Sequence, residues 1–328
     1  MDKVVAPAGQ GEVVEEVFVR SRENPLITSE DMPYLANTVF NAGAVDLGDE
    51  VLLLARVESA SGRSHLIAMR SEDGVTNWRV EEKALLHPAD NYPHEENGCE
   101  DCRITWLEDM ECYVLAYTAY SGHGPGVALA KTKDFKSVSR LGLALPPDDK
   151  NAALFPATFE KGRYAMLHRP SVGGGSIWIS YSPDLQFWGK SRLVVPVRSG
   201  PWWDGARVGA GMTPIRTEQG WLIIYHGVKE LAGSPIYRLG AALLDLEEPH
   251  KLKCRARRWL IGPRRQYERT GDAPNVIFSC GGFVRDGVLW CYYGAADSSI
   301  CLARAKLDDI LHVVHNEPVE GAQYRELI

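Results

Sequence analysis

The chain has 328 residues, of which 45% are hydrophobic and 24% are charged, and its formal net charge is −7. This composition is ordinary for a globular protein with a large core, and no apolar run approaches the length of a membrane span. Because the chain is acidic and has no dominant Lys/Arg cluster, we expect neither a nucleic acid nor a membrane as a partner.

The first 20 residues differ from the rest, since acidic and apolar residues alternate over residues 12–17. We expect residues 1–20 to form an arm or short helix outside the main domain, and such an arm is a candidate contact in a homo-oligomer. Residues 1–7 lack the apolar core of a signal peptide, so we expect a cytoplasmic protein.

Five short apolar runs recur along the chain, and each ends in polar or aromatic residues. Their spacing of roughly 50 to 70 residues is in the range typical of propeller blades or solenoid turns. The runs cover residues 51–56, 112–117, 164–169, 221–226 and 288–293.

A second repeated element, at residues 71–78, 132–137 and 182–188, combines a hydroxyl residue, an Asp and an aromatic residue. We expect the Asp to cap a hairpin turn and the aromatic residue to pack between sheets. The two repeats together predict an all-β fold, a single five-bladed β-propeller catalytic domain over residues 21–328. A two-sheet sandwich would explain the strands but not their period.

The densest polar segment covers residues 94–106. Asp101 and Arg103 are two residues apart, so on an extended segment both point to the same face. A carboxyl beside a guanidinium normally stays ionised, so an acid role for Asp101 requires burial or a substrate hydroxyl that shares its proton. A surface salt bridge is the alternative. Cys99 and Cys102 form a C-x-x-C pair that nothing nearby completes into a zinc site, so we expect a reduced pair and no metal.

Side chains suited to binding anions lie near the ends of several strand-like runs. Each one alone has an ordinary structural explanation, but at equivalent blade positions they would form a positively charged funnel. Arg forks in particular suit phosphate or carboxylate. The residues are Arg56, Lys150, Arg169, Arg207, His226 and Tyr237.

Seven short motifs lie at residues 40–44, 100–103, 153–156, 167–170, 208–211, 224–227 and 293–297. Taken together, they resemble glycoside hydrolase family 130, the inverting β-mannoside phosphorylases such as β-1,4-mannooligosaccharide phosphorylase. The resemblance extends from residue 24 to residue 297, and the five-bladed propeller of that family agrees with the repeats.

The resemblance implies that Asp101 is the general acid and acts through the 3-hydroxyl of the mannosyl unit. Phosphate would attack from the opposite face, so it is a co-substrate and no cofactor is expected. Arg103 and Asp297 would hold mannosyl hydroxyls. Cys102 replaces a usual proline and Arg207 a frequent lysine, and neither change removes a reacting group. The residues expected to bind phosphate are Arg56, Arg169, Arg207, His226 and Tyr237, assisted by Asn41 and Lys150.

We therefore expect a phosphorylase that cleaves β-1,4- or β-1,2-linked mannosides and releases α-mannose 1-phosphate. One alternative is an inverting β-mannosidase, whose second carboxylate would come from a set of nearby glutamates. The other is a glycan-binding propeller without catalysis. The linkage, the acceptor sugar and the oligomeric state stay open. The candidate glutamates are Glu58, Glu95, Glu96 and Glu100.

Overall fold

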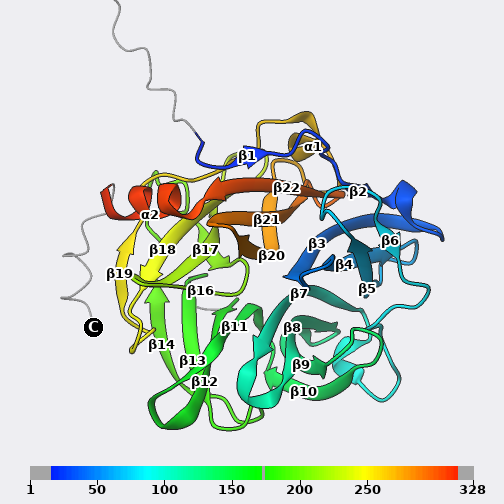
Figure 1. The fold of residues 1–328 in the computed structure, drawn as a ribbon, viewed down its shortest axis with the longest axis horizontal. Coiled ribbons are helices and arrows are strands. Elements are labelled where there is room, and N and C mark those ends of the chain that lie inside the picture. Colours follow the sequence, from blue (N-terminus) through cyan, green and yellow to red (C-terminus); the bar gives the residue numbers. More distant parts are fainter. Residues whose placement is uncertain (1–15, 172–173, 317–328) are drawn as a thin grey trace, which may run out of the picture.

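The computed structural model describes residues 16–171 and 174–316, and β-strands dominate it (Figure 1). The prediction of an all-β fold is confirmed. Residues 1–15, most of the expected arm, lie outside the described residues, as do residues 317–328 of the expected catalytic domain. No helix in the described part of the chain is both long and apolar enough to cross a membrane.

The first sheet consists of two antiparallel four-stranded units that a single parallel pair, Ser64 with Gly98, joins edge to edge. The first unit contains β3 (Ala36–Asp46), β4 (Val51–Ser59), β5 (Ser64–Ser71) and β6 (Arg79–Val80). The second contains β7 (Gly98–Leu107), β8 (Cys112–Ser121), β9 (Gly124–Thr132) and β10 (Ser139–Leu145).

Three further antiparallel sheets follow in chain order. One contains β11 (Asp149–Phe159), β12 (Arg163–Pro170), β13 (Ile177–Ser182) and β14 (Gly189–Val195). The next contains β15 (Arg207–Ala210), β16 (Ile215–Thr217), β17 (Gly220–Lys229), β18 (Ile236–Leu244) and β19 (Leu252–Arg255).

The last sheet joins the two ends of the described chain. It contains β20 (Ile277–Arg285), β21 (Val288–Ala295) and β22 (Ser299–Lys306), and both β1 (Val19–Arg20) and β2 (Ile27–Thr28) pair with β22. The helices are α1 (Gln266–Arg269) and α2 (Leu307–Asn316), with short 3-10 turns at Ser29–Asp31, Pro93–Glu95, Glu108–Met110 and Glu160–Gly162.

The sheets pack face to face through side chains that alternate along each strand. In β4, Leu52 and Leu54 belong to the apolar cluster shared with β7 and β8, whereas Leu53 and Ala55 belong to the cluster shared with β21 and β22. Alternation sends successive side chains to opposite faces, and here both faces are covered by a neighbouring sheet. The apolar runs in the sequence are therefore continuous rather than alternating.

The repeated Asp turns have the predicted structure. Asp73 Oδ1 accepts the backbone N–H groups of Val75 and Thr76. Asp134 and Asp184 accept the backbone N–H groups two and three residues further on in the same way. The capping role predicted for these aspartates is therefore confirmed.

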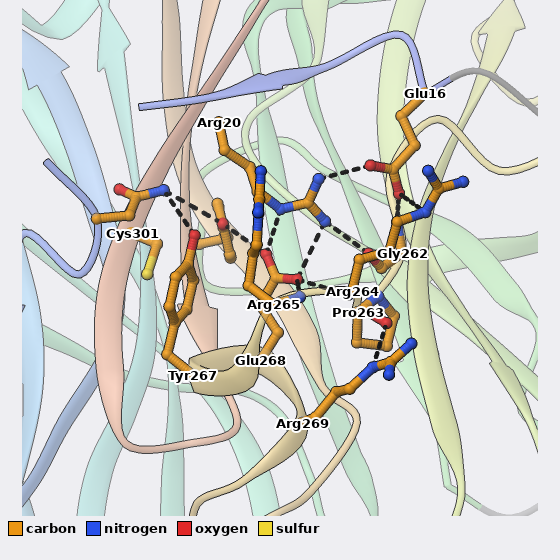
Figure 2. A network of polar contacts seen from close by, with 12 residues as sticks. Glu16, Arg20, Gly262, Pro263, Arg264, Arg265, Tyr267, Glu268, Arg269 and Cys301 are labelled. Carbon is orange, nitrogen blue, oxygen red and sulfur yellow. Dashed lines mark hydrogen bonds and ion pairs between the residues drawn. The ribbon is translucent and has the colours of Figure 1, made fainter. Parts of the chain in front are cut away.

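A buried carboxylate, Glu268, ties the first described residues to the last sheet (Figure 2). Its side chain accepts hydrogen bonds from Arg20 Nε at 2.6 Å, from the Tyr293 hydroxyl at 2.9 Å and from the backbone N–H groups of Arg264 and Arg265. Glu16 adds a second partner for Arg20. This network fixes the segment that leads through α1 into β20.

Candidate active site

Bulges interrupt β3, β7, β11 and β20, which succeed one another in space, since β3 contacts both β20 and β7, and β7 contacts β11. In three of these strands, a residue with a positive φ angle occupies the bulge: Asn41 at 46°, Asp101 at 51° and Asn151 at 57°. Bulges re-aim side chains, and left-handed backbone at residues other than glycine is concentrated at functional sites. These bulges therefore mark a candidate site.

Asp101 is buried at its bulge, and its carboxylate has two side-chain partners. Oδ1 accepts a hydrogen bond from Asn41 Nδ2 at 3.0 Å and one from Arg56 Nη1 at 3.2 Å. Burial opposes ionisation, but the guanidinium groups of Arg56 and Arg103 and these hydrogen bonds outweigh it, so the pKa of Asp101 is lowered. The carboxyl is therefore ionised at neutral pH.

Arg56, which the sequence analysis assigned to phosphate, lies against carboxylates. Besides Asp101, it bonds Glu100 Oε1 at 3.1 Å and donates from Nε to Ser64 Oγ at 2.9 Å. Asn41 likewise uses its amide nitrogen on Asp101. Both residues are thus placed to orient the carboxyl of Asp101.

Arg103 does not pair with the carboxylate of Asp101. Its guanidinium donates to three backbone carbonyls: that of Asp101 at 2.7 Å and those of Ala210 and Gly211 at 2.9 Å each. The side chain is 1% exposed. Arg103 therefore links the bulge of β7 to the end of β15. The two-residue spacing of Asp101 and Arg103 does not reveal this contact, because the bulge changes the alternation of side chains along β7.

A group of cations occupies the neighbouring strands. Lys150 on β11 and Arg169 on β12 lie directly opposite each other in the strand register. Burial lowers the pKa of each side chain, and the positive charge of Arg169 lowers the pKa of Lys150 further. Within residues 16–171 and 174–316, neither forms a hydrogen bond or an ion pair with a carboxylate, and Arg169 Nε is buried without a partner. Opposed like charges destabilise a sheet, so this pair favours an anionic ligand.

His226 on β17 lies among these cations. Burial and the positive charges of Arg169, Arg103 and Lys150 lower its pKa well below the usual value, so the ring is neutral, and Nδ1 is buried without a hydrogen-bond partner. Phe278 packs against the ring with centroids 4.5 Å apart. A Cβ on Gly209 would lie 2.4 Å from the ring, so only glycine fits there.

Arg207 and Tyr237 form the outer part of the cationic group. The Tyr237 hydroxyl accepts hydrogen bonds from Arg207 Nη2 at 2.8 Å and Nε at 3.3 Å. Glu230 accepts a further bond from Arg207 Nη1. The Tyr237 ring also lies 5.9 Å from that of His226, so the structure brings together five of the seven residues expected to bind phosphate.

Sequence reasoning missed a buried hydrogen-bond chain behind Lys150 and Arg169. Asp149 Oδ2 bonds His168 Nδ1 at 2.7 Å, and His168 Nε2 contacts Ser180 Oγ at 2.8 Å. His168 ends one of the five apolar runs, residues 164–169, beside Arg169, but neither the run nor the motif at residues 167–170 predicts that it pairs with Asp149. Its partner Ser180, on the adjacent strand β13, carries no sequence signal.

Asp297 follows β21 and is the second carboxyl group near Asp101. Burial, together with the charge of Asp101, raises its pKa from 3.8 to about 7. Burial likewise raises the pKa of Glu100, whereas Arg56 acts against it. Environments that push the pKa values of neighbouring carboxyls apart are typical of acid–base sites.

The raised pKa of Asp297 predicts a pH-dependent stability. Between about pH 4 and about pH 7 the folded protein holds a proton on Asp297 that the unfolded chain has lost, so the free energy of unfolding falls as pH rises. Asp297→Asn cannot ionise, so we expect it to be more stable than the parent at about pH 8 and closer to it at about pH 4. Thermal melts of both proteins across this range measure the effect, and parallel curves would contradict it.

The other candidate carboxylates have partners of their own. Glu95 accepts hydrogen bonds from Tyr117 and Arg140, and Glu96 accepts one from the backbone of Gly122. Glu58 accepts one from Asn37. Two of the four glutamates also pair with Arg56, the guanidinium that bonds Asp101: Glu100 Oε1 lies 3.1 Å from Arg56 Nη2, within hydrogen-bond distance, and Glu58 Oε2 lies 3.9 Å from it.

The C-x-x-C pair is part of the core. Cys99 and Cys102 are buried in the apolar cluster between the first two units, and neither forms a disulfide. Burial raises the pKa of both thiols. Among the described residues, no group of three or more His, Cys, Asp or Glu side chains is arranged to hold a metal ion.

Comparisons with known proteins place these observations in a family. The glycoside hydrolase family 130 model, described as beta-1,4-mannooligosaccharide phosphorylase, matches residues 13–316. The chain is 38% identical over 257 residues to a beta-1,2-mannobiose phosphorylase of Listeria innocua, covering 77% of this chain and 70% of the relative. It is 34% identical over 314 residues to a beta-1,4-mannooligosaccharide phosphorylase of Ruminococcus albus, covering 92% and 91%.

Solved structures agree. The Listeria innocua beta-1,2-mannobiose phosphorylase in complex with beta-1,2-mannobiose superimposes with a TM-score of 0.83 at 32% sequence identity, covering 92% of this chain and 99% of that one. The expected resemblance is thereby confirmed, and the chain belongs to glycoside hydrolase family 130.

Proposed function

We propose that this chain is an inverting phosphorylase that cleaves β-mannosides with inorganic phosphate and releases α-mannose 1-phosphate. The observation that carries the proposal is a buried carboxyl, Asp101, beside a separate cationic group, Lys150 and Arg169, which has no carboxylate partner among the described residues. The names of both relatives, which differ in linkage, support phosphorolysis and leave β-1,2 and β-1,4 substrates as candidates.

The proposed architecture is a five-bladed propeller, with the five antiparallel units as blades of one catalytic domain that begins at residue 21. The contacts support this arrangement, because β3, β7, β11 and β15 each contact the next, and β20 contacts β3, β17 and β18. In Figure 1, β3, β7, β11 and β20 gather around the middle of the ribbon. Such an arrangement would bring residues from distant parts of the chain to one site.

In this proposal the phosphate-binding residues are Lys150, Arg169, Arg207, His226 and Tyr237. Charge-assisted hydrogen bonds from guanidinium groups suit a phosphate, and the unpaired Arg169 Nε and His226 Nδ1 are free to contribute. Arg56 and Asn41 orient Asp101, and Arg103 supports its backbone. Asp297 holds a mannosyl hydroxyl, as the resemblance implies. The reaction requires no metal or organic cofactor, because phosphate itself is the nucleophile.

The reaction is a single inverting displacement. A phosphate oxygen attacks the anomeric carbon as the glycosidic bond breaks on the opposite face. Asp101 gives its proton to the mannosyl 3-hydroxyl, which passes its own proton to the leaving oxygen. Because Asp101 is ionised in the free protein, it must gain a proton when substrates bind. A bound phosphate anion offsets the cations that lower its pKa, which favours that protonation.

The test is the phosphate dependence of sugar release. With β-1,4- and β-1,2-linked mannobiose as substrates, we expect α-mannose 1-phosphate to form only when phosphate is present, as followed by phosphorus NMR. The reaction should be faster with one of the two linkages, and that linkage identifies the natural substrate. Free mannose released equally with and without phosphate would overturn the proposal and select hydrolysis, for which Glu100, which shares the guanidinium of Arg56 with Asp101, is a candidate base.

A further inference from the structure

The buried hydrogen-bond chain that begins at Asp149 crosses a whole sheet. It passes from Asp149 on β11 to His168 on β12 and on to Ser180 on β13. Ser180 Oγ lies 2.8 Å from Ser191 Oγ on β14, where the chain ends. His168 is 3% exposed and Ser180 is fully buried, whereas Ser191 is exposed. No step of the proposed reaction uses this chain, although it begins beside the cations of the site.

The order Asp, His and Ser is also that of the catalytic triad of serine hydrolases, in which the serine attacks a substrate carbonyl. Access excludes that role here. Ser180 is 0% exposed, and its hydroxyl already has two hydrogen-bond partners, His168 and Ser191. A substrate therefore cannot reach the serine, and the chain must act through the residues that surround it.

Asp149 and His168 lie directly behind the two cations of the site. Lys150 is opposite Arg169 across β11 and β12, and each cation follows one of the two residues in the sequence. Successive side chains of a strand point to opposite faces. The cations therefore occupy one face of the strand pair, and the hydrogen bond between Asp149 and His168 occupies the other. The charges of both cations lower the pKa of His226, as expected if both face the site.

Two features weaken the pairing of β11 with β12 at this point. Opposed like charges destabilise a sheet, so the two cations push the strands apart while no anion is bound. The ladder is also interrupted, because the register shifts between Lys150 and Ala153, where Asn151 has a φ angle of 57°. The hydrogen bond between Asp149 Oδ2 and His168 Nδ1, at 2.7 Å, joins the same two strands across this irregular stretch.

From this arrangement we propose that Asp149 and His168 are positioning residues for the phosphate co-substrate. Their hydrogen bond holds β11 and β12 together, so that Lys150 and Arg169 keep the spacing at which both contact one phosphate ion. Ser180 fixes the imidazole from its other side. The inference rests on the proposed phosphorolysis, because that reaction supplies phosphate as the ligand of the cations.

The test uses two amides that each keep one end of the imidazole. A carboxylate only accepts hydrogen bonds, so His168 donates from Nδ1 to Asp149. His168→Asn places an amide N–H near the position of Nδ1 and keeps this bond, whereas His168→Gln places its amide near Nε2 and loses it. We expect His168→Gln to raise KM for phosphate by about tenfold, the effect of one lost charge-assisted hydrogen bond, and to leave KM for the mannoside unchanged. His168→Asn should stay close to the parent in both constants.

Two smaller changes complete the series and protect it against misfolding. Ser180→Ala removes only the hydroxyl that fixes the imidazole, so it should raise KM for phosphate less than His168→Gln does. Ser191→Ala is the control, because it removes the exposed end of the chain and leaves the bond between Asp149 and His168 in place. Its constants should equal those of the parent. An equal rise in KM for phosphate and for the mannoside would indicate a general structural role and overturn the inference. So would equal effects of His168→Asn and His168→Gln.

Binding measurements separate this inference from the proposed function. Calorimetric titration of inorganic phosphate, without a mannoside, should show weaker binding to His168→Gln than to the parent and to His168→Asn. If no mannoside yields α-mannose 1-phosphate, the proposed function fails, but this order of phosphate affinities still supports the positioning role. Phosphate that binds His168→Gln and the parent equally would overturn the positioning role and leave phosphorolysis intact.

Discussion

Asp101→Asn is expected to lose about 10²- to 10⁴-fold in kcat, the usual contribution of a general acid, while still binding its sugar. Asparagine has nearly the same shape and can keep an acceptor toward Arg56 and Asn41, but it has no proton to pass on. The same loss should appear in the reverse reaction from mannose 1-phosphate, because both directions share one transition state. Initial rates in both directions and calorimetric titration of mannobiose measure the effect.

The control for this variant is Asp184→Asn. Asp184 caps the turn between β13 and β14 through the N–H groups of Gln186 and Phe187, so its replacement removes a carboxylate without touching the site. Its kcat should equal that of the parent. Retained turnover in Asp101→Asn would assign the proton donor elsewhere, with Asp297 first in line because its pKa is raised to about 7.

The sequence predicted the features that depend on local chemistry. The Asp turns follow from hydrogen bonds between residues two and three positions apart, so Asp73, Asp134 and Asp184 could be assigned a capping role directly. The five apolar runs also predicted strands, and the structure adds that both faces of such a strand are covered, as Leu52 and Leu53 show.

The orientation of the site residues could not be predicted in the same way. Alternation along an extended strand places Asp101 and Arg103 on one face, but the bulge at Asp101 breaks that alternation. Arg103 consequently reaches carbonyls of β15, more than 100 residues away along the chain. The different surroundings of two arginines could not be predicted either. Arg56 bonds carboxylates, whereas Arg169 has a buried nitrogen without a partner, and this difference depends on which strands are neighbours.

Glu268→Gln is expected to destabilise the fold by about 1–3 kcal/mol, because it removes one of the two buried carboxylates that pair with Arg20 and leaves Glu16 as the remaining charge partner. Both side chains of this ion pair are buried: Glu268 is fully buried, and the side chain of Arg20 is 9% exposed. The amide can still accept from Tyr293 and the backbone, but its nitrogen adds donors where Arg264 and Arg265 already donate. Urea denaturation at equilibrium measures the loss as a lower midpoint.

The matched control for Glu268→Gln is Glu81→Gln. Glu81 pairs with Arg70 at 3.0 Å, but its side chain is 37% exposed, so water replaces the lost interaction. We expect a cost of about 0–1 kcal/mol for this surface pair. Equal losses in the two variants would mean that Glu16 alone satisfies the charge of Arg20 and that Glu268 does not hold the first strand in place.

A double variant separates charge from shape in the same network. Arg20→Met combined with Glu268→Gln removes both charges, so it should recover part of the stability lost in Glu268→Gln alone. Recovery should be incomplete, because Glu16 then loses its partner Arg20 and the backbone N–H groups of Arg264 and Arg265 still face a neutral amide. The network lies close to the site in the chain, because the segment after α1 continues into β20, which contacts β3, and Val276 in that segment accepts a hydrogen bond from the backbone N–H of Ala296, next to Asp297.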